Sequence, residues 1–393
     1  MNGNGDRLRL PPGLDGEAFL RDYWQKQPLL MPAALSAQRF TLTPEELAGL
    51  ACETQFESRL IIEDDEGRRE VRHGPFADTV FAALPESHWT LLVQDVDKYI
   101  PDMVSLVEAF DMVPNWRIDD IMISYATDQG GVGPHTDAYD VFLMQASGRR
   151  RWRISDRQYG EGDLLPDIDQ RILRHFHTTR EWVLGPGDVL YLPPGVAHWG
   201  TADGPCMTYS LGFRAPSQQE LASDWFQYLV ALSDDRRLDD PDDLRADSHA
   251  QLTPGVFGRA AQLLNKLPDT HSDDFRRWLG CYLTEPKAQF EIAPRVPAWQ
   301  RADLADCLRQ AQTLRRHPFA HIAWTVLDDA RVVLFIQGED LTLPSLLQPW
   351  VRQIAERRQL EAEEIAPMLA ATPEAGELLL RLVNDGILEV VEE

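Results

Sequence analysis

The chain has 393 residues, a formal net charge of −25, 44% hydrophobic residues and 26% charged residues. This length allows two or three domains with cores of their own, and the composition is that of a soluble globular protein. Such acidity argues against nucleic-acid binding, which depends on lysine and arginine, and favours basic partners, although an acidic surface can also serve solubility alone.

Targeting signals and cysteine chemistry are not evident in the sequence. No apolar run reaches the length of a membrane span, and the polar residues 1–12 do not resemble a secretory signal. The four cysteines are scattered without CxxC spacing, which argues against a zinc site or a disulfide framework. We therefore expect a cytoplasmic protein.

The first half of the chain predicts a β-rich domain. Residues 15–30 predict a helix with an aromatic face that continues into an apolar strand at 28–31. From about residue 115, short β-like runs are separated by glycine and proline, at 121–125, 139–145, 151–154, 182–184, 189–192 and 207–213. Short strands at regular spacing with turn signals predict an all-β barrel or jelly roll, with helical padding on its N-terminal side.

The second half predicts helices and a small mixed module. Ser217 and Glu220 form a capping box ahead of an apolar helix, and two amphipathic segments follow at about 256–267 and 272–284. The last hundred residues predict the order helix, strand, strand, helix, helix, strand, which suits a winged helix. Residues 301–393 carry nine arginines against sixteen acidic residues. A DNA-reading winged helix is normally basic, so we expect a packing or interaction module.

A glycine-rich turn that ends in His135-Thr136-Asp137 carries the most informative chemistry. In an extended strand, residues two apart point to the same face, so His135 and Asp137 present an imidazole and a carboxylate side by side. His198, after the rigid turn 193–195, supplies a third ligand from a neighbouring strand. Two imidazoles and one carboxylate form the facial triad of non-haem Fe(II) oxygenases. Two of the remaining positions on the metal suit a 2-oxo acid, and the last suits dioxygen.

Other histidines have simpler interpretations. A second His-x-Asp pair, His271 and Asp273, lies in a charged helical stretch and is predicted to be a surface cap. His175 and His177 also lie two apart, but no carboxylate is adjacent to them, so we expect surface histidines.

An anionic co-substrate needs a cation inside the pocket. Arg150 lies 15 residues after His135, and its guanidinium can hold a distal carboxylate bidentately, as lysine cannot. Ser124 lies 11 residues before His135 on the preceding strand and can add a hydroxyl. The alternatives are a solvated basic run for Arg150 and an ordinary strand serine for Ser124.

Further segments resemble the bacterial ribosomal oxygenases of the Jumonji C class. They include Phe19 and the segments 24–28, 73–76, 116–124, 131–135, 139–142, 148–153 and 212–216. The resemblance covers nearly the whole chain. It implies a mainly β catalytic core, a cupin-like double-stranded β-helix or jelly roll, with an all-α middle region and a C-terminal winged helix.

The same resemblance implies domains and an assembly. Residues 1–214 would be the Jumonji C catalytic domain with N-terminal helical padding. Residues 215–296 would be a helical dimerisation region, and residues 297–393 a winged-helix-like module without direct DNA binding. A homodimer is therefore expected.

The resemblance also implies an activity. It is that of an Fe(II)- and 2-oxoglutarate-dependent dioxygenase that uses O₂ to hydroxylate C3 of an arginine in large-subunit ribosomal protein L-sixteen, whereas eukaryotic relatives hydroxylate histidine. Carried over to this sequence, His135, Asp137 and His198 bind iron, and Ser124 and Arg150 bind 2-oxoglutarate.

Ribosomal proteins are basic, so a cationic target needs acidic and aromatic partners near the metal. Asp128 and Asp140 flank the triad segment, and Tyr139 offers a ring for stacking. Pairing of Asp140 with Arg149 or Arg151, and packing of Tyr139 in the barrel, are the structural alternatives.

Three other functions compete with protein hydroxylation. Demethylation of methyl-lysine needs an aromatic cage, which the sequence does not locate. A non-enzymatic cupin-type regulator would bind DNA through its winged helix. A zinc or manganese isomerase on the same barrel would not need Arg150.

Overall fold

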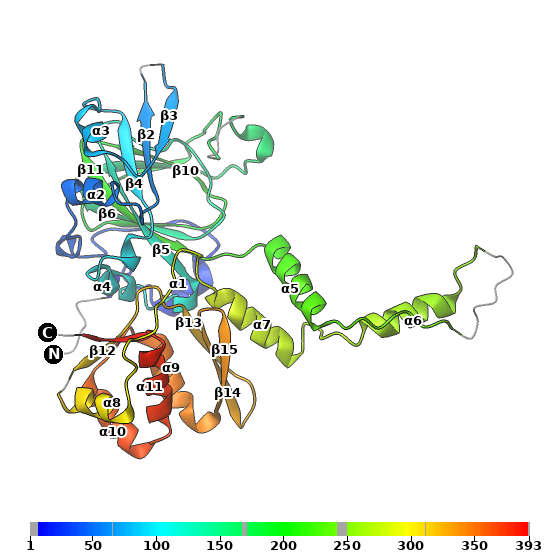
Figure 1. The fold of residues 1–393 in the computed structure, drawn as a ribbon. Helices are drawn as coiled ribbons and strands as arrows, with labels where there is room; N and C mark the ends of the chain where they lie inside the picture. The colour runs from blue at the N-terminus through cyan, green and yellow to red at the C-terminus, as the bar shows by residue number, and fades with distance from the viewer. Residues whose placement is uncertain (1–6, 65, 167–170, 242–249, 311, 392–393) are drawn as a thin grey trace. The chain divides into compact units, whose positions relative to one another are not determined.

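The computed structural model describes residues 7–64, 66–166, 171–241, 250–310 and 312–391. The chain forms two compact units, Met1–Ala215 and Pro216–Glu393 (Figure 1). Within the described ranges, no helix is long and apolar enough to cross a membrane.

The first unit is built on an antiparallel eight-stranded sheet with the order β1-β9-β6-β11-β5-β4-β2-β3. Its strands are β1 (Leu29–Met31), β2 (Ser58–Glu63), β3 (Arg69–His73), β4 (Trp89–Val93), β5 (Ile118–Ala126), β6 (Val141–Ser147), β9 (Val189–Leu192) and β11 (Cys206–Phe213). A second sheet has the order β10-β7-β8 and consists of β7 (Arg150–Ser155), β8 (Arg180–Leu184) and β10 (Ala197–Ala202). All six predicted runs after residue 115 correspond to strands of these sheets, whereas β10 was not among the predicted runs.

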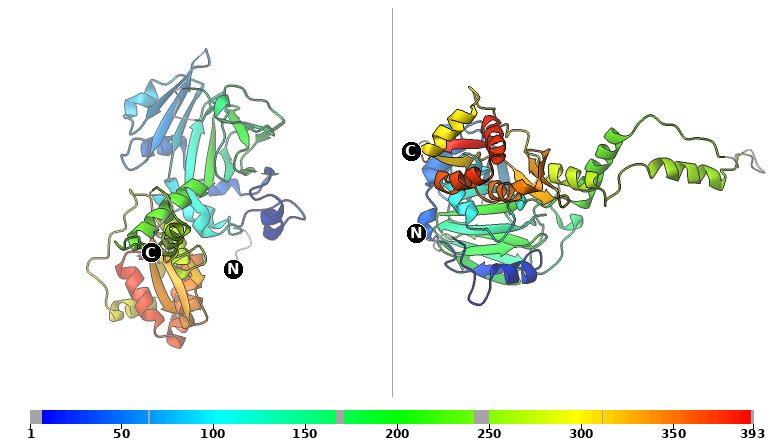
Figure 2. Two further views of the ribbon diagram at one scale, coloured as in Figure 1. Left: turned by 90° about the vertical axis from the view of Figure 1, so that its right-hand side faces the viewer. Right: turned by 90° about the horizontal axis from the view of Figure 1, so that it is seen from below.

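Alternation along the strands sorts their side chains between two cores. One cluster joins the two sheets and contains Val141, Leu143, Leu190 and Leu192 from the large sheet and Trp152, Ile154 and Leu184 from the small one. Phe142 and Tyr191 occupy alternate positions and face the other way, where their ring centroids lie 5.8 and 5.1 Å from that of Phe19. Figure 2 shows these sheets in two further views. This alternation is the period-two signal from which the strands were predicted.

Short helices cover the outer face of the large sheet. They are α1 (Gly16–Asp22), α2 (Pro44–Leu50), α3 (Asp78–Ala82) and α4 (Met103–Glu108). The helix predicted over 15–30 was therefore too long. Gln25 has a left-handed φ of 59°, and its N–H donates to the Tyr191 hydroxyl at 2.7 Å. This turn ends the helical region and leads the chain into β1.

The second unit begins with three helices, α5 (Gln218–Leu232), α6 (Pro254–Leu264) and α7 (Asp273–Thr284). The predicted capping box is present, because the Ser217 side chain accepts from the Glu220 N–H and the Glu220 carboxylate accepts from the Ser217 N–H. The three predicted helices of this region are confirmed.

The rest of the second unit is a mixed module with two small sheets, β16-β12-β17 and β13-β14-β15. Its elements are α8 (Arg301–Arg309), β12 (Thr313–Arg316), β13 (Ile322–Val326), β14 (Arg331–Ile336), β15 (Glu339–Pro344), α9 (Gln348–Glu356), β16 (Gln359–Leu360), α10 (Ala362–Ala371), α11 (Ala375–Asn384) and β17 (Leu388–Val391). The predicted hairpin is β13 and β14, and the predicted final helix and strand are α11 and β17. The order predicted from the sequence omitted β12, β15 and β16, and it had three helices where the structure has four.

Helix α7 packs directly on the sheet β13-β14-β15. A Cβ at Gly280 would lie 2.3 Å from the Phe335 ring, so only glycine allows this close approach. Arg277 of α7 also forms an ion pair with Asp340 of β15. The three-part division at residues 214 and 296 stays a prediction. Helix α7 comes before residue 296 and the sheet comes after it, yet both belong to one packed body in the second unit.

Candidate functional site

The predicted triad residues lie together, but two of them are not on the element expected. His135 and Asp137 lie in the loop between β5 and β6, and His135 makes only isolated bridges, to Ile172 and His198. The prediction that His135 opens a strand was therefore wrong. Gly133 has a φ of 100° and turns the chain just before His135. His135 is therefore the one residue of this loop that forms a bridge to a neighbouring segment. His198 lies within strand β10, which agrees with the expectation of a ligand from a neighbouring strand.

Main-chain hydrogen bonds hold the three residues together. The His135 N–H donates to the His198 carbonyl at 3.0 Å, and the His198 N–H donates back at 2.9 Å. The Gly195 N–H, in the turn before β10, donates to the Asp137 carbonyl at 2.8 Å. The glycine-rich and proline-rich turns thus dock on each other, which removes the 63-residue separation in sequence.

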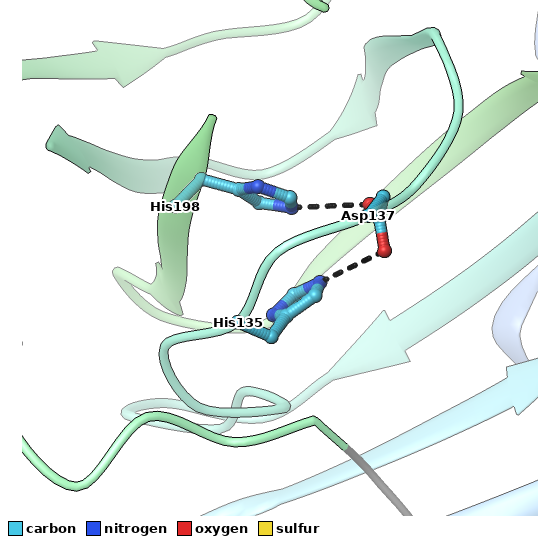
Figure 3. A group of neighbouring side chains, drawn as sticks. All are labelled: His135, Asp137 and His198. Carbon is cyan, nitrogen blue, oxygen red and sulfur yellow. Dashed lines mark ion pairs between the residues drawn. The ribbon is translucent and has the colours of Figure 1, made fainter. Parts of the chain in front are cut away.

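Their side chains converge on one point, as Figure 3 shows. The Asp137 carboxylate lies 3.5 Å from His198 Nε2 and 3.9 Å from His135 Nε2. One ligand atom from each of the three residues lies within 4.8 Å of the others, and no other such group occurs in the described ranges. Adjacent ligands of an octahedral cation with bonds of about 2.1 Å lie roughly 3 Å apart, so a small inward adjustment suffices to bind one.

Both imidazoles are oriented through their other nitrogen. His135 Nδ1 lies 2.9 Å from the Gly133 carbonyl, and His198 Nδ1 lies 3.0 Å from the Val196 carbonyl. A Nδ1–H donated to a carbonyl leaves Nε2 with a lone pair directed at the metal position. Burial, followed by repulsion from His135, lowers the pKa of His198 to about 4. The ring is therefore neutral at physiological pH, as a metal ligand must be.

Arg150 and Ser124 meet in a buried polar cluster. Arg150 Nη1 donates to the Ser124 hydroxyl at 3.2 Å and lies 3.5 Å from the Thr208 hydroxyl. Thr208 donates in turn to the Gln145 side chain at 3.2 Å. Thr208 of β11 pairs directly with Ser124 of β5 and Gln145 of β6, so adjacent strands place these groups side by side.

Arg150 is a buried cation without a counter-ion. Its exposed fraction is 3%, and it makes no ion pair with any residue that the structure describes. Its Nε and the indole Nε1 of Trp152 have no hydrogen-bond partner, and desolvation lowers the pKa of Arg150. A buried charge of this kind is costly unless a ligand neutralises it. A Cβ at Gly200 would lie 2.8 Å from Arg150 Nε and 2.7 Å from the Trp152 ring, so glycine keeps this space open.

Asp140 lies away from the triad and is a structural residue. Its side chain has no exposed surface and accepts from the Tyr191 hydroxyl at 2.6 Å, from Gln25 at 3.1 Å and from Arg117 at 3.2 Å. A carboxylate with these three partners cannot contact a substrate, so that prediction was wrong. The structural alternative named the wrong arginine: Asp140 pairs with Arg117, whereas Arg149 pairs with Asp203 and Arg151 with Glu181.

The other two predicted substrate residues have different surroundings. Asp128 is exposed, and its carboxylate accepts from the Gly204 N–H at 2.8 Å, which fixes a neighbouring turn. Tyr139 is 44% exposed, so it does not pack inside the barrel. Desolvation of its hydroxyl, followed by the charge of Asp137 and then of Asp120, raises the pKa of Tyr139.

Sequence reasoning missed several polar residues of the site. A Cβ at Gly212 would lie 3.3 Å from an Asp120 carboxylate oxygen and 3.8 Å from the Tyr139 ring, so both flank this glycine, whereas Asp119 lies 3.7 Å from Arg214. The signal of Asp119 and Asp120 in the sequence was a pair of carboxylates at the start of an otherwise apolar strand. Thr208 and Gln145 carried no comparable signal, because single polar residues in strands are common.

The other histidine pairs are outside this site, as predicted. Ser272 caps α7 by accepting from the Phe275 N–H at 3.1 Å, which makes the segment around His271 a helix cap. His175 and His177 are exposed.

A histidine–carboxylate–histidine triad beside an unneutralised arginine, inside a double-stranded β-helix, defines the site of a 2-oxo-acid-dependent oxygenase. A JmjC domain family matches residues 105–221, and a ROXA-like winged helix family matches residues 262–389. The predicted mainly β core and C-terminal winged helix are thereby confirmed.

Known proteins are similar to half or more of the chain, and two of them to nearly all of it. The chain is 34% identical to the ribosomal protein uL16 3-hydroxylase of Escherichia coli (strain K12), over 94% of this chain and 95% of that protein. A probable ribosomal oxygenase of Haemophilus influenzae is 36% identical over 54% of this chain and 52% of that one. The structure of YcfD, a ribosomal oxygenase from Escherichia coli, in complex with cobalt and 2-oxoglutarate has a TM-score of 0.81 and 31% identity, over 98% of this chain and 99% of that one. The chain belongs to the JmjC ribosomal oxygenases, so the predicted enzyme class, a 2-oxoglutarate- and Fe(II)-dependent dioxygenase, is confirmed.

Proposed function

We propose that this protein hydroxylates C3 of an arginine in ribosomal protein uL16, the L-sixteen of the sequence-based prediction, with Fe(II), 2-oxoglutarate and O₂. The observation that carries the proposal is the buried, unneutralised guanidinium of Arg150 next to the triad. It fits the distal carboxylate of a five-carbon diacid whose 2-oxo acid end reaches the metal. Similarity to the uL16 3-hydroxylase over 94% of the chain supports the choice of substrate.

His135, Asp137 and His198 would hold Fe(II), with one ligand atom from each side chain. When bound together, iron and 2-oxoglutarate activate O₂, so that one oxygen atom enters the substrate C–H bond and the other enters succinate, with release of CO₂. The chain's own residues position these groups. Arg150 and Ser124 orient the diacid, and the carbonyls that accept from Nδ1 fix the imidazole rings. Misplacing the target carbon by about 1 Å can cost on the order of 100-fold in rate.

Tyr139 and nearby carboxylates suit a cationic side chain. The exposed ring of Tyr139 offers a face for a guanidinium, and the charges of Asp120 and Asp119 act on the same region. The net charge of −25 speeds encounter with a basic protein. Asp128, which is exposed, is a further candidate.

The test is mass spectrometry of uL16 incubated with the iron-loaded enzyme, 2-oxoglutarate and O₂. We expect a gain of one oxygen atom, located by fragmentation at an arginine β-carbon, with formation of one succinate per hydroxylation. A hydroxyl on histidine, loss of a methylene from methyl-lysine, or DNA binding without succinate would each replace this function with one of its competitors.

A homodimer and a cytoplasmic location belong to the same proposal. Helices α5 and α6 expose large apolar side chains, including Phe226 at 64%, Val230 at 73%, Phe257 at 61% and Leu264 at 65%. Exposed apolar surface on successive helices is typical of a protein–protein interface. A ribosomal-protein substrate would be met in the cytoplasm.

A further inference from the structure

A cavity of about 630 Å³ in the second unit has no role in the proposed chemistry. Its walls come from the segment 286–292, from strands β14 and β15, and from the end of α11. Apolar side chains form its floor, among them Leu334, Ile336, Leu341, Leu382 and Ile387. This volume lies within the range of ordinary ligand pockets, which are largely apolar with a few polar groups. We call it the α11 cavity.

The walls of the α11 cavity are fixed by packing. Phe290 is 2% exposed and packs on Phe319, with ring centroids 4.8 Å apart. The Arg295 N–H donates to the carbonyl of Asn384 at 2.8 Å and ties the segment after the wall to α11. A Cβ at Gly386 would lie 2.4 Å from the carbonyl of Ala293, so the two backbones touch. The cavity therefore exists before any ligand binds, which lowers the entropic cost of binding.

The rim of the α11 cavity carries an excess of negative charge. Arg381 lies 3.3 Å from Asp385, and Asp340 pairs with Arg277 of α7, so these charges are compensated. Glu291 and Glu339 are exposed on the rim, and no ion pair of either is found among the described residues. Lys287 also lines the cavity, so its ionisable side chains are two cations and four carboxylates, and the net charge is negative. An apolar floor below a rim of this charge matches a ligand that has an apolar group flanked by positive charges.

We propose that the α11 cavity docks a second, basic segment of the protein substrate, separate from the segment that is hydroxylated. An apolar side chain of that segment lies on the floor, and flanking lysine or arginine side chains pair with Glu291 and Glu339. A second copy of this chain, with its net charge of −25, brings the wrong sign of charge to the rim. The proposal rests on the proposed function, because it assumes that uL16 is the substrate.

The test compares a double variant with a charge-matched control in the full-length enzyme. Glu291→Lys/Glu339→Lys reverses the rim charge, and Asp329→Lys/Glu363→Lys makes the same change at exposed positions outside the cavity. Steady-state kinetics are measured with whole uL16 and with a short uL16 peptide that contains the hydroxylated arginine. For the rim variant we expect KM for whole uL16 to rise roughly 10-fold, since two ion pairs are lost. The kcat, and both constants for the short peptide, stay unchanged.

A binding measurement tests the cavity independently of turnover. Fluorescence anisotropy of labelled overlapping uL16 peptides should identify a basic, apolar peptide that is not hydroxylated. It should bind the wild type and the control, and lose affinity for the rim variant. The docking proposal would be overturned if the rim variant and the control had equal KM values for whole uL16. It would also be overturned if every peptide bound the rim variant as tightly as the wild type. If no uL16 is hydroxylated, the proposed function fails, and the anisotropy result still decides whether the cavity binds basic peptides.

Discussion

His135 and His198 are joined by two reciprocal main-chain hydrogen bonds, of 3.0 and 2.9 Å, although 62 residues separate them in the chain. Each backbone thereby fixes the position of the other's side chain. The imidazole centroids lie 4.2 Å apart as a result. A metal ion does not have to bring these two ligands together, so the backbone contributes preorganisation that the side chains alone would lack.

The first prediction concerns the carboxylate ligand. Asp137→Ala removes the anionic member of the triad, and we expect hydroxylation of uL16 to fall below detection while the fold is retained. Asp273→Ala is the matched control, because it alters the other His-x-Asp pair, which lies at the start of α7. Mass spectrometry and circular dichroism measure both variants. Substantial hydroxylation by folded Asp137→Ala protein would refute the triad.

The second prediction concerns recognition of the co-substrate. Arg150→Lys keeps the charge but not the planar, bidentate donor pair, so we expect KM for 2-oxoglutarate to rise by roughly 10- to 100-fold. Arg151→Lys is the control, because Arg151 lies on the opposite face of β7 and pairs with Glu181. Succinate formation at varied 2-oxoglutarate measures both. Equal KM values for the two variants would show that Arg150 does not bind the co-substrate.

The third prediction concerns pH and the metal-free protein. The folded pKa of His198 is about 4, below the ordinary value of 6.5, so the unfolded chain takes up a proton first as pH falls. The stability from this neutral ring is complete above pH 6.5 and is lost as pH falls toward 4. Between pH 7 and pH 5 we expect a loss of about 2 kcal/mol from this group.

Urea unfolding of the metal-free protein at several pH values measures this loss. His198→Gln should reduce the slope of stability against pH, whereas His175→Gln, at an exposed position, should not. An unchanged slope in His198→Gln would contradict the prediction.

The fourth prediction concerns assembly. Phe226→Asp/Phe257→Asp places charges on the exposed apolar faces of α5 and α6, and we expect a dimeric wild type to become monomeric. Leu346→Asp, whose side chain is 54% exposed elsewhere in the second unit, should leave the dimer intact. Light scattering coupled to size-exclusion chromatography gives the masses. A monomeric wild type would refute the dimer outright.

Local patterns explain what could be predicted from the sequence. The strands after residue 115 alternate between two cores, and this period is visible in the residues themselves. His135, Asp137 and Arg150 stand next to turn residues that mark their places. Asp140 could not be interpreted this way, because its partners Gln25 and Tyr191 are 115 and 51 residues away in the chain.

Long-range pairing also explains the errors at the site. Whether His135 opens a strand depends on how far its pairing with His198 extends, and it extends over one residue only. Thr208 and Gln145 join the polar cluster through the register of β11 with its two neighbours. Register is set by packing across the whole sheet, which a single segment does not reveal.

The fifth prediction concerns a buried ion pair that supports the start of β5. Lys98 and Asp97 have side chains that are only 3% and 1% exposed, and Lys98 Nζ lies 2.9 Å from the Asp97 carboxylate. Lys98 also donates to the Asp119 carbonyl at 2.8 Å, and Asp97 accepts from the Ile121 N–H at 2.8 Å. Lys98→Met would leave a buried carboxylate unpaired, so we expect a loss of roughly 3–5 kcal/mol in unfolding free energy.

The double variant Asp97→Asn/Lys98→Met separates the charge from the packing. It removes both charges while the asparagine oxygen can still accept from the backbone of β5, so we expect most of the lost stability to return. Lys26→Met, which changes an exposed lysine, should stay within about 0.5 kcal/mol of the wild type. Chemical denaturation of all three variants provides the comparison. If the single and double variants at this pair lose the same free energy, the unpaired charge is not the cause. The start of β5 would then depend on the lysine for its packing and for its hydrogen bond to the Asp119 carbonyl.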